Sequence, residues 1–414
     1  MKPATPFLAA AERYRSPVTE LLGDLIHTPS LSADEADVIE LLRQQMESLG
    51  YDEAVIDPFG SVIGRIGSGP LIIVYDAHVD TVGVGCREEW SADPYEPRLQ
   101  AGVIHGRGAC DDKGGIAAMV MGGALYRELS PTDDVTLYVV GSVQEEDCDG
   151  LALEHLLTSV LPRPDLVVLG EATNGGVFRG HRGRVEVLVR TRGSTCHASA
   201  PDRGRNPVYD LGPIIGEIQE LNGKLGWDEF LGAGSIAVTK VLCETPSLNA
   251  VPSTSTLYID RRLTIGEDPD RALEDIRDLP AIRAAGAEVE LLTYDRTSFT
   301  GMTLSMTKQY PTWVLPEHDN AVKAGIAAGV TALGRAPRTG HWVFRPTGWH
   351  RWANSAFRRS VMDRATRFMP IPSPISALLT TSSTRWPGTP RSPRRICHRR
   401  RRQKRRDLFP PQWQ

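Results

Sequence analysis

The chain has no apolar segment of the roughly 20 residues that a helix needs to cross a lipid bilayer. Its N-terminus lacks the basic and hydrophobic layout of a secretory signal. Six cysteines in 414 residues do not indicate a disulfide framework. Two of them, Cys110 and Cys148, lie beside acidic motifs, where a packing role and a thiolate ligand both stay open. We therefore expect a cytoplasmic protein without a membrane partner.

A histidine and an aspartate follow the first strongly apolar run. Residues 71–75 predict a buried strand, and His78 and Asp80 come at its end. Side chains at positions i and i+2 of a strand point to the same face. His78 can therefore bind a metal ion while Asp80 orients its ring. The alternative is a polar strand end at the surface.

A pair of aspartates follows next along the chain. Asp111 and Asp112 stand between a glycine-containing turn and a helix predicted over residues 116–129. Glycines let the backbone approach an ion closely, and a helix N-terminus favours carboxylates. An ordinary loop or helix cap is the alternative. The position after the His-x-Asp pair favours a metal site.

Two further strand ends carry acids. Glu145 and Glu146 follow an apolar run at 135–140, and Glu171 follows another at 165–169. Adjacent side chains at a strand end diverge, so one carboxylate can bind metal while its neighbour acts on water as a general base. Taken alone, each of these two segments would be interpreted as an ordinary acidic loop. Together, one imidazole and several carboxylates suit a cation such as zinc. The sequence thus predicts metal-assisted hydrolysis.

The order of these motifs resembles the M20 metallopeptidase and amidohydrolase family. That family includes acetylornithine deacetylases, succinyl-diaminopimelate desuccinylases, aminoacylases and carboxypeptidases. The chain is most similar to the bacterial subgroup described as selenium-metabolism-linked hydrolases. The resemblance runs from the N-terminus to about Phe344. It implies cleavage of an amide bond in an N-acyl amino acid or a short peptide.

The resemblance also implies a role for each acid. His78, Asp111 and Glu171 would bind one divalent ion, zinc or cobalt. Asp111 would bridge to a second ion, which Glu146 would bind. Glu145 would be the general base, and Asp80 would orient the ring of His78.

Three residues outside this cluster also match family motifs. His197 resembles the histidine that reaches a neighbouring active site and stabilises the developing oxyanion. Asn249 and Arg262 resemble the substrate-binding asparagine and arginine, and Arg262 could grip a substrate carboxylate with two hydrogen bonds. Without the family, these would be a loop histidine, a turn asparagine and a surface arginine.

The strand pattern and the resemblance predict an α/β fold. Residues 1–179 and 297–344 would form a mixed-sheet catalytic domain like that of zinc peptidases. Residues 180–296 would form an inserted α+β lid, through which the chain would make a homodimer. Residues 34–49 show the spacing of an amphipathic helix. In the lid we expect strands at 184–189, 234–242 and 255–263 and helices near 208–222 and 268–277.

The C-terminal residues differ sharply in charge. Residues 345–414 hold sixteen Arg and one Lys against two Asp, which gives a net charge of +15. Since the whole chain has a net charge of −4, residues 1–344 carry −19. Four of the eight Trp are also there. The basic run at 398–406 could bind nucleic acid electrostatically, but this is the distant alternative.

We favour a frameshift after Phe344. The family has a glycine-bearing substrate loop at this point and then a metal-binding histidine, and neither is present. Shifting the codons back by one base permits Thr-Asp-Gly-Val-Ala-Ser-Met-Gly across residues 345–353 and Tyr-Ala-His-Thr near 368–372. The tail would then be a disordered segment, and the chain would hold one ion instead of two. The alternative function is a family member that binds metal with little turnover.

Overall fold

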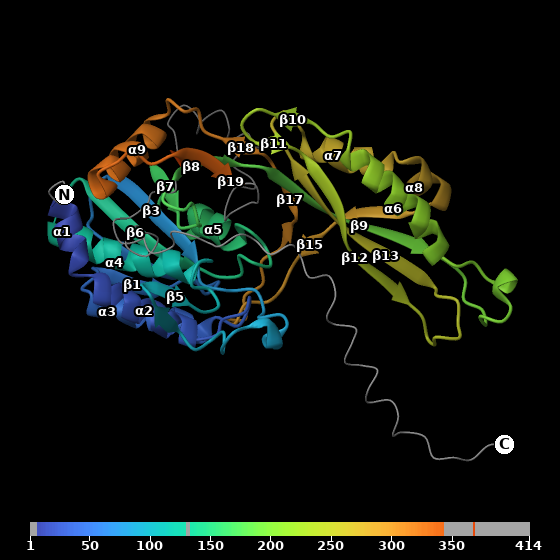
Figure 1. Ribbon diagram of the computed structural model, residues 1–414, viewed down its shortest axis with the longest axis horizontal. Coiled ribbons are helices and arrows are strands. Elements are labelled where there is room, and N and C mark those ends of the chain that lie inside the picture. Colours follow the sequence, from blue (N-terminus) through green and yellow to red (C-terminus); the bar gives the residue numbers. More distant parts are fainter. Residues whose placement is uncertain (1–5, 130–132, 343–366, 369–414) are drawn as a thin grey trace, which may run out of the picture.

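The computed structural model describes residues 6–129, 133–342 and 367–368. They form two lobes (Figure 1). The first lobe holds a mixed sheet covered by helices, and the second holds an antiparallel sheet with helices on one face. The expected mixed α/β architecture with a separate α+β unit is therefore confirmed.

The sheet of the first lobe has six strands in the order β1-β2-β6-β3-β7-β20. Strand β3 runs parallel to both β6 and β7, whereas β2 is antiparallel to β1 and β6. The carboxyl ends of β3, β6 and β7 consequently meet at one edge. The strands span Glu53–Ile56 (β1), Val62–Ile66 (β2), Leu71–His78 (β3), Val135–Ser142 (β6), Leu166–Leu169 (β7) and Arg367–Phe368 (β20).

Helices pack on this sheet through apolar stripes. In α3, Val38, Ile39, Leu42 and Met46 are fully buried, at the spacing that predicted an amphipathic helix. Helix α4 contacts both β3 and β6 as well as α2. The helices of this lobe are Pro6–Glu12 (α1), Arg15–His27 (α2), Ala36–Ser48 (α3), Lys113–Leu129 (α4), Leu151–His155 (α5) and Asn320–Leu333 (α9).

A smaller sheet in the first lobe joins distant parts of the chain. Strand β8, Val177–His181, lies between β18, Trp313–Val314, and β19, Thr339–Trp342. The chain therefore leaves for the second lobe and returns from it at the same place. Arg98–Gln100 (β4) and Val103–His105 (β5) form a separate hairpin.

The second lobe is a sheet in the order β12-β13-β9-β14, with β17 also pairing β9. Alternate side chains of β9 and β13, such as Val187 and Ile259, are buried in a core with the helices. The opposite face of the sheet is not covered by these helices. The elements are Gly183–Arg192 (β9), Ser235–Glu244 (β12), Thr254–Leu263 (β13), Glu288–Leu291 (β14), Gln309–Tyr310 (β17), Val208–Asn222 (α6), Pro269–Arg277 (α7) and Pro280–Ala285 (α8).

Two short hairpins and three short helical segments, the 3-10 turns Arg87–Glu89 and Pro201–Arg203 and the π-helical turn Leu156–Val160, complete the described chain. Trp227–Asp228 (β10) pairs with Gly232–Ala233 (β11), and Thr293–Tyr294 (β15) pairs with Met306–Thr307 (β16). The domain boundaries 179/180 and 296/297 stay predictions. The elements nearest to them are β8, which ends at His181, and β17, which pairs with β9 of the second lobe. The expectation for residues 345–414 lies outside the described residues, apart from β20.

Among the helices of residues 6–129 and 133–342, none has the length and apolar character to cross a bilayer.

Candidate metal centre

The proposed ligands gather where three parallel strands end. His78 is the last residue of β3, Glu145 and Glu146 follow β6, and Glu171 follows β7. Asp111 stands just before α4, which packs on β3 and β6. The fold therefore brings together four segments that are far apart in sequence.

His78 is at the centre of this cluster and is 1% exposed. Its Nδ1 lies 2.9 Å from the backbone oxygen of Asp80, and its Nε2 lies 3.0 Å from Asp111 Oδ1 and 4.0 Å from Glu171 Oε1. A neutral ring that donates from Nδ1 to a carbonyl carries its lone pair on Nε2. Nε2 is then the atom available to a metal.

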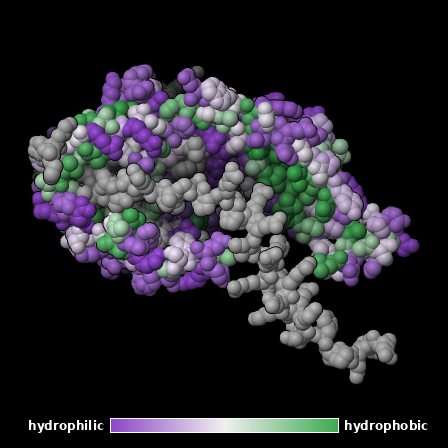
Figure 2. All heavy atoms as spheres, in the orientation of Figure 1, coloured by the Kyte–Doolittle hydropathy of each residue, from purple (hydrophilic) through white to green (hydrophobic). Residues whose placement is uncertain are grey.

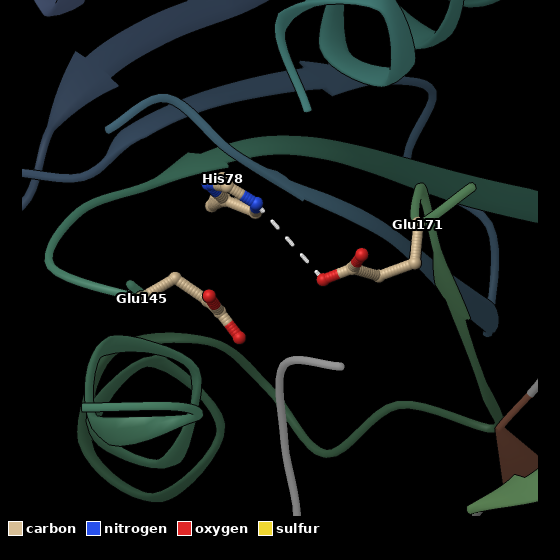
Figure 3. Close-up of side chains that lie close together, drawn as sticks. All are labelled: His78, Glu145 and Glu171. Carbon is tan, nitrogen blue, oxygen red and sulfur yellow. Dashed lines mark ion pairs between the residues drawn. The ribbon is translucent and has the colours of Figure 1, made fainter. Parts of the chain in front are cut away.

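Two groups of side chains could each hold an ion. Ligand atoms of His78, Glu145 and Glu171 lie within 4.8 Å of one another, and so do those of His78, Asp111 and Glu146. Figure 3 shows the first group, in which the Glu171 carboxylate points toward the imidazole and forms the marked ion pair with it. The structure thus brings all five predicted side chains together. It groups Glu171 with Glu145, where the sequence grouped it with Asp111.

Asp80 contacts the His78 ring through both its backbone and its side chain, and the expectation that its side chain orients the ring stays a prediction. Strand β3 ends at His78, so the two residues do not share a strand face. The backbone carbonyl of Asp80 makes the short contact with the ring, whereas its Oδ1 is 3.5 Å away. Its carboxylate accepts the backbone N–H groups of Glu145 and Glu146, both at 3.1 Å, and the hydroxyl of Ser32 at 2.6 Å. Asp80 therefore ties the histidine to the turn that carries both glutamates.

Burial and crowding shift the protonation of the cluster. Burial alone would lower the pKa of His78, but the carboxylates of Asp111 and Asp80 hold it well above the usual value. Burial raises the pKa of Glu145 strongly and that of Glu146 to about 7. These carboxyl groups lie too close together to ionise all at once. A divalent cation among them would compensate their negative charge.

Asp112 diverges from its neighbour. Asp111 has a side chain 63% exposed, whereas Asp112 is 1% exposed, and neither of its oxygens has a hydrogen-bond partner among the described residues. Burial and the charge of Glu171 raise its pKa. A Cβ on Gly115 would lie 2.2 Å from Asp112 Oδ1 and 2.8 Å from the oxygen of Gly170. Glycine is required there because α4 begins so close to this carboxylate.

One imidazole nitrogen, several carboxylates and buried oxygens without partners fit a divalent metal ion.

His197 and Asn249 lie apart from this cluster. Both are exposed on loops of the second lobe, where Ala198 N donates to Asn249 O at 2.8 Å. The loop between β12 and β13 that carries Asn249 is at the end of this lobe away from the first (Figure 1). Over the described residues, neither metal-binding group includes them. The structure thus joins the two loops that carry these residues.

Arg262 belongs to a chain of ion pairs that sequence reasoning missed. Its Nε and Nη2 lie 2.6 and 3.0 Å from the carboxylate of Asp260, which is also 2.9 Å from Arg184 Nε. Arg184 in turn reaches Asp149, at 3.3 Å, in the segment after Glu145. This series of ion pairs therefore links the second lobe to the segment that carries the predicted base. Alternation along β9 and β13 would place these residues on one face, but it does not give their partners.

The open face of the second lobe is hollowed. A cavity of about 350 Å³ lies among Arg184, Asp260, Lys240 and Tyr258. The Lys240 ammonium stands 5.6 Å from the centre of the Tyr258 ring. Figure 2 shows apolar side chains over the strands of this lobe, where Val241 and Leu242 of β12 are exposed.

Comparison with known proteins agrees with this fold. Residues 179–286 match the family model described as peptidase dimerisation domain. The chain is 43% identical over 341 residues to the protein YgeY of Escherichia coli K12, which covers 82% of this chain and 85% of that protein. It is 29% identical over 287 residues to a succinyl-diaminopimelate desuccinylase of Bordetella petrii, covering 67% and 74% of the two chains.

Solved structures share the architecture. The M20 metallo-carboxypeptidase Sso-CP2 of Sulfolobus solfataricus superposes with a TM-score of 0.64 at 18% identity, over 88% of this chain and 97% of that one. The Bacillus subtilis protein YXEP, described as a dinuclear metal binding peptidase, has a TM-score of 0.58 at 16% identity over 90% and 96%. A mixed α/β lobe, a unit that matches the dimerisation-domain model and a strand-end cluster of candidate metal ligands agree with a class of metal-binding peptidases. The chain belongs to the M20 peptidase family.

Proposed function

We propose that this protein is a metal-dependent hydrolase that cleaves an amide bond in an N-acyl amino acid or a short peptide. The buried His78, surrounded by carboxylates from three strand ends, carries this proposal. Relatives described as a desuccinylase and as a carboxypeptidase act on such bonds, which supports the choice of substrate class. The closer likeness to selenium-metabolism-linked hydrolases and a cytoplasmic location are part of the proposal.

We assign the ligands as the family resemblance implies. His78, Asp111 and Glu171 would hold one ion, zinc or cobalt, and Asp111 and Glu146 would hold a second. The alternative grouping of Glu171 with Glu145 makes this assignment testable. A divalent ion at this site would polarise the amide carbonyl as a Lewis acid.

Glu145 is the proposed general base. It takes a proton from the attacking water as the new C–O bond forms, and it returns that proton to the nitrogen as the C–N bond breaks. Burial raises the pKa of Glu145, which suits a group that must accept a proton and then return it. Asp80 holds the Glu145 N–H and the His78 ring in place.

The second lobe supplies the remaining contacts. We propose a homodimer through residues 179–286, in which His197 and Asn249 of one chain act at the partner's site. The exposed apolar residues of the outer strand β12 support a protein contact there. Arg262 would bind a substrate carboxylate. The neighbouring cavity would take the part of the substrate remote from the scissile bond.

An impaired enzyme is the second candidate. The charge of residues 345–414 and the absence of the family's loop and histidine motifs favour a frameshift after Phe344. Such a chain would bind metal, mostly one ion, with little turnover. The coding DNA around codon 344 tests the frameshift directly. Nucleic-acid binding by the basic run stays a distant alternative, and a salt-dependent shift with DNA would support it.

A substrate panel separates the two candidates. The protein is stripped of metal, reloaded with zinc or cobalt and assayed on N-acetyl and N-succinyl amino acids and on dipeptides. Metal-dependent release of the free amine supports the active hydrolase. Bound metal without hydrolysis supports the impaired enzyme. Hydrolysis that survives complete removal of metal would overturn both.

A further inference from the structure

Glu35 is a buried carboxylate that neither metal-binding group contains. It is fully buried at the start of α3. Its Oε1 accepts two backbone N–H groups, from Ala33 at 2.9 Å and from Gln144 at 3.0 Å. Its Oε2 is buried and has no hydrogen-bond partner among the described residues. Such a group needs an explanation, because a buried carboxylate is costly unless it organises its surroundings.

Both N–H groups belong to residues in an unusual backbone conformation. Ala33 has a φ of 66° and Gln144 a φ of 56°, in the left-handed region that favours glycine. Side chains other than glycine hold this conformation only when their surroundings impose it. One oxygen of Glu35 therefore fixes two strained positions that are 111 residues apart (33 and 144).

The second of these positions starts the turn that bears the proposed base. Gln144 precedes Glu145 and Glu146, and its side-chain oxygen accepts the hydroxyl of Tyr294 at 2.6 Å. The next two N–H groups of the turn are held by Asp80. Three successive backbone N–H groups are thus each bound by a buried carboxylate.

The segment before Glu35 supports the same site from behind. Ser32 donates to Asp80, and Ser30 donates its hydroxyl to the backbone oxygen of Val79 at 2.7 Å. The segment from 30 to 35 therefore contacts both the residues that follow His78 and the residues that carry the glutamates.

We propose that Glu35 is a positioning residue, which holds Gln144 in its left-handed conformation and so directs the carboxylates of Glu145 and Glu146 into the metal centre. The inference rests on the proposed function of those two glutamates. Glu35 itself touches neither substrate nor metal, because it is fully buried behind the turn.

Two substitutions at this position separate anchoring from simple filling of space. Glu35→Gln keeps an oxygen that accepts both N–H groups, whereas Glu35→Leu fills similar space without an acceptor. The chain offers a matched control in Asp57. One oxygen of this buried carboxylate likewise accepts two backbone N–H groups, from Gly60 at 2.7 Å and from Ser61 at 2.6 Å. Those contacts lie in the turn between β1 and β2, and neither metal-binding group includes Asp57.

The first measurement is hydrogen exchange of the full chain by mass spectrometry, which needs no substrate. Glu35→Leu should speed exchange of the peptide that spans residues 144–146, and Glu35→Gln should leave it close to the wild type. Asp57→Leu should speed exchange at 57–61 only. Unchanged exchange at 144–146 in Glu35→Leu would overturn the anchoring role, whatever the enzyme's substrate.

The second measurement is turnover on the substrate found in the panel. Glu35→Leu should lower kcat by about tenfold to a hundredfold with KM nearly unchanged, as for other residues that orient a metal site. Glu35→Gln should keep most of the wild-type kcat, and Asp57→Leu should keep all of it. An equal loss of kcat in Asp57→Leu would show a general effect of destabilisation and overturn the proposal. If the wild type hydrolyses nothing on the panel, the proposed function fails, while hydrogen exchange still decides the role of Glu35.

Discussion

At the scale of single residues, neighbours in sequence take opposite environments. Asp112 is buried where Asp111 is exposed, and Glu145 is 7% exposed beside a half-buried Glu146. Divergence of adjacent side chains at a strand end was predicted for the two glutamates, but no such split was predicted for the two aspartates. The sequence did not predict which glutamate lies nearer to which ligand, because that depends on the turn that follows β6.

Glu145→Ala tests the assignment of the base. Turnover should fall by about a hundredfold to ten-thousandfold, the usual effect of losing a general base, with metal content almost unchanged. Metal analysis and kcat measured on the same preparation check this. Glu146→Ala is the control and should weaken binding of a second ion in a zinc titration while the first, tightly held ion is kept. If Glu145→Ala loses the metal instead, the roles of the two residues are exchanged, as the grouping with His78 and Glu171 allows.

Glu35 should also leave a mark on the pH dependence of stability. Burial, followed by the charge of Asp80, raises its pKa from 4.5 to about 8. Between these values the folded chain binds more protons than the unfolded chain, so stability falls as pH rises. The contribution is fully present below about pH 4.5 and is lost as pH rises through about 8.

Glu35→Gln removes that titration. Urea unfolding at a series of pH values should show the variant gaining stability relative to the wild type between about pH 4.5 and about 8. Parallel stability curves for the two proteins would show that Glu35 does not titrate in this window.

Sequence reasoning pointed to the residues of the candidate centre and to Asp80, but not to Ser32 and Glu35. His78, Glu145 and Glu171 follow apolar runs and Asp111 precedes a predicted helix, and these local patterns can be read from one chain. Ser32 and Glu35 act through hydrogen bonds to residues 48 and 109 positions away. No local pattern carries such contacts, because they depend on how the loop before α3 packs against the end of β6.

At the scale of elements, long periodic segments were predictable. Helix α6 spans the predicted residues 208–222, and β9, β12 and β13 contain most of the predicted strands. The short elements α8 and β14 were not predicted, since six and four residues show too little periodicity. The close start of α4 against the acidic cluster also escaped prediction.

Gly115→Ala tests that close approach. The added methyl group would clash with Asp112 Oδ1 and the oxygen of Gly170, so the variant should lose on the order of 2 kcal/mol of stability and bind metal more weakly. Gly122→Ala in the same helix meets nothing within 4 Å and should instead gain about 0.5–1 kcal/mol. Thermal unfolding and zinc titration compare the two. Equal stability of both variants would contradict the packing described for the start of α4.

At the scale of the whole molecule, the site as proposed is completed by a second chain. The exposed His197 lies in the second lobe, outside both metal-binding groups found in the described residues. A symmetric dimer can bring it to the partner's centre. The sequence could suggest this only through the family resemblance, because one chain carries no record of its partner.

Mixing two inactive variants tests the exchange of His197. A dimer of His197→Ala with Glu145→Ala has one intact site, so unfolding and refolding the mixture should restore about a quarter of wild-type activity. Each variant refolded alone is the control. Failure of the mixture to recover activity, with dimers confirmed by ultracentrifugation, would place His197 outside the partner's site.

Zinc content is the most direct test of the central claim, that His78 and the carboxylates at the strand ends form a metal centre. After dialysis, the wild type should retain about one zinc ion per chain, as expected of a site with one imidazole and two carboxylates. His78→Ala should lose it, and His197→Ala should keep it. A wild type that holds no zinc, or a His78→Ala variant that holds as much as the wild type, would contradict the account.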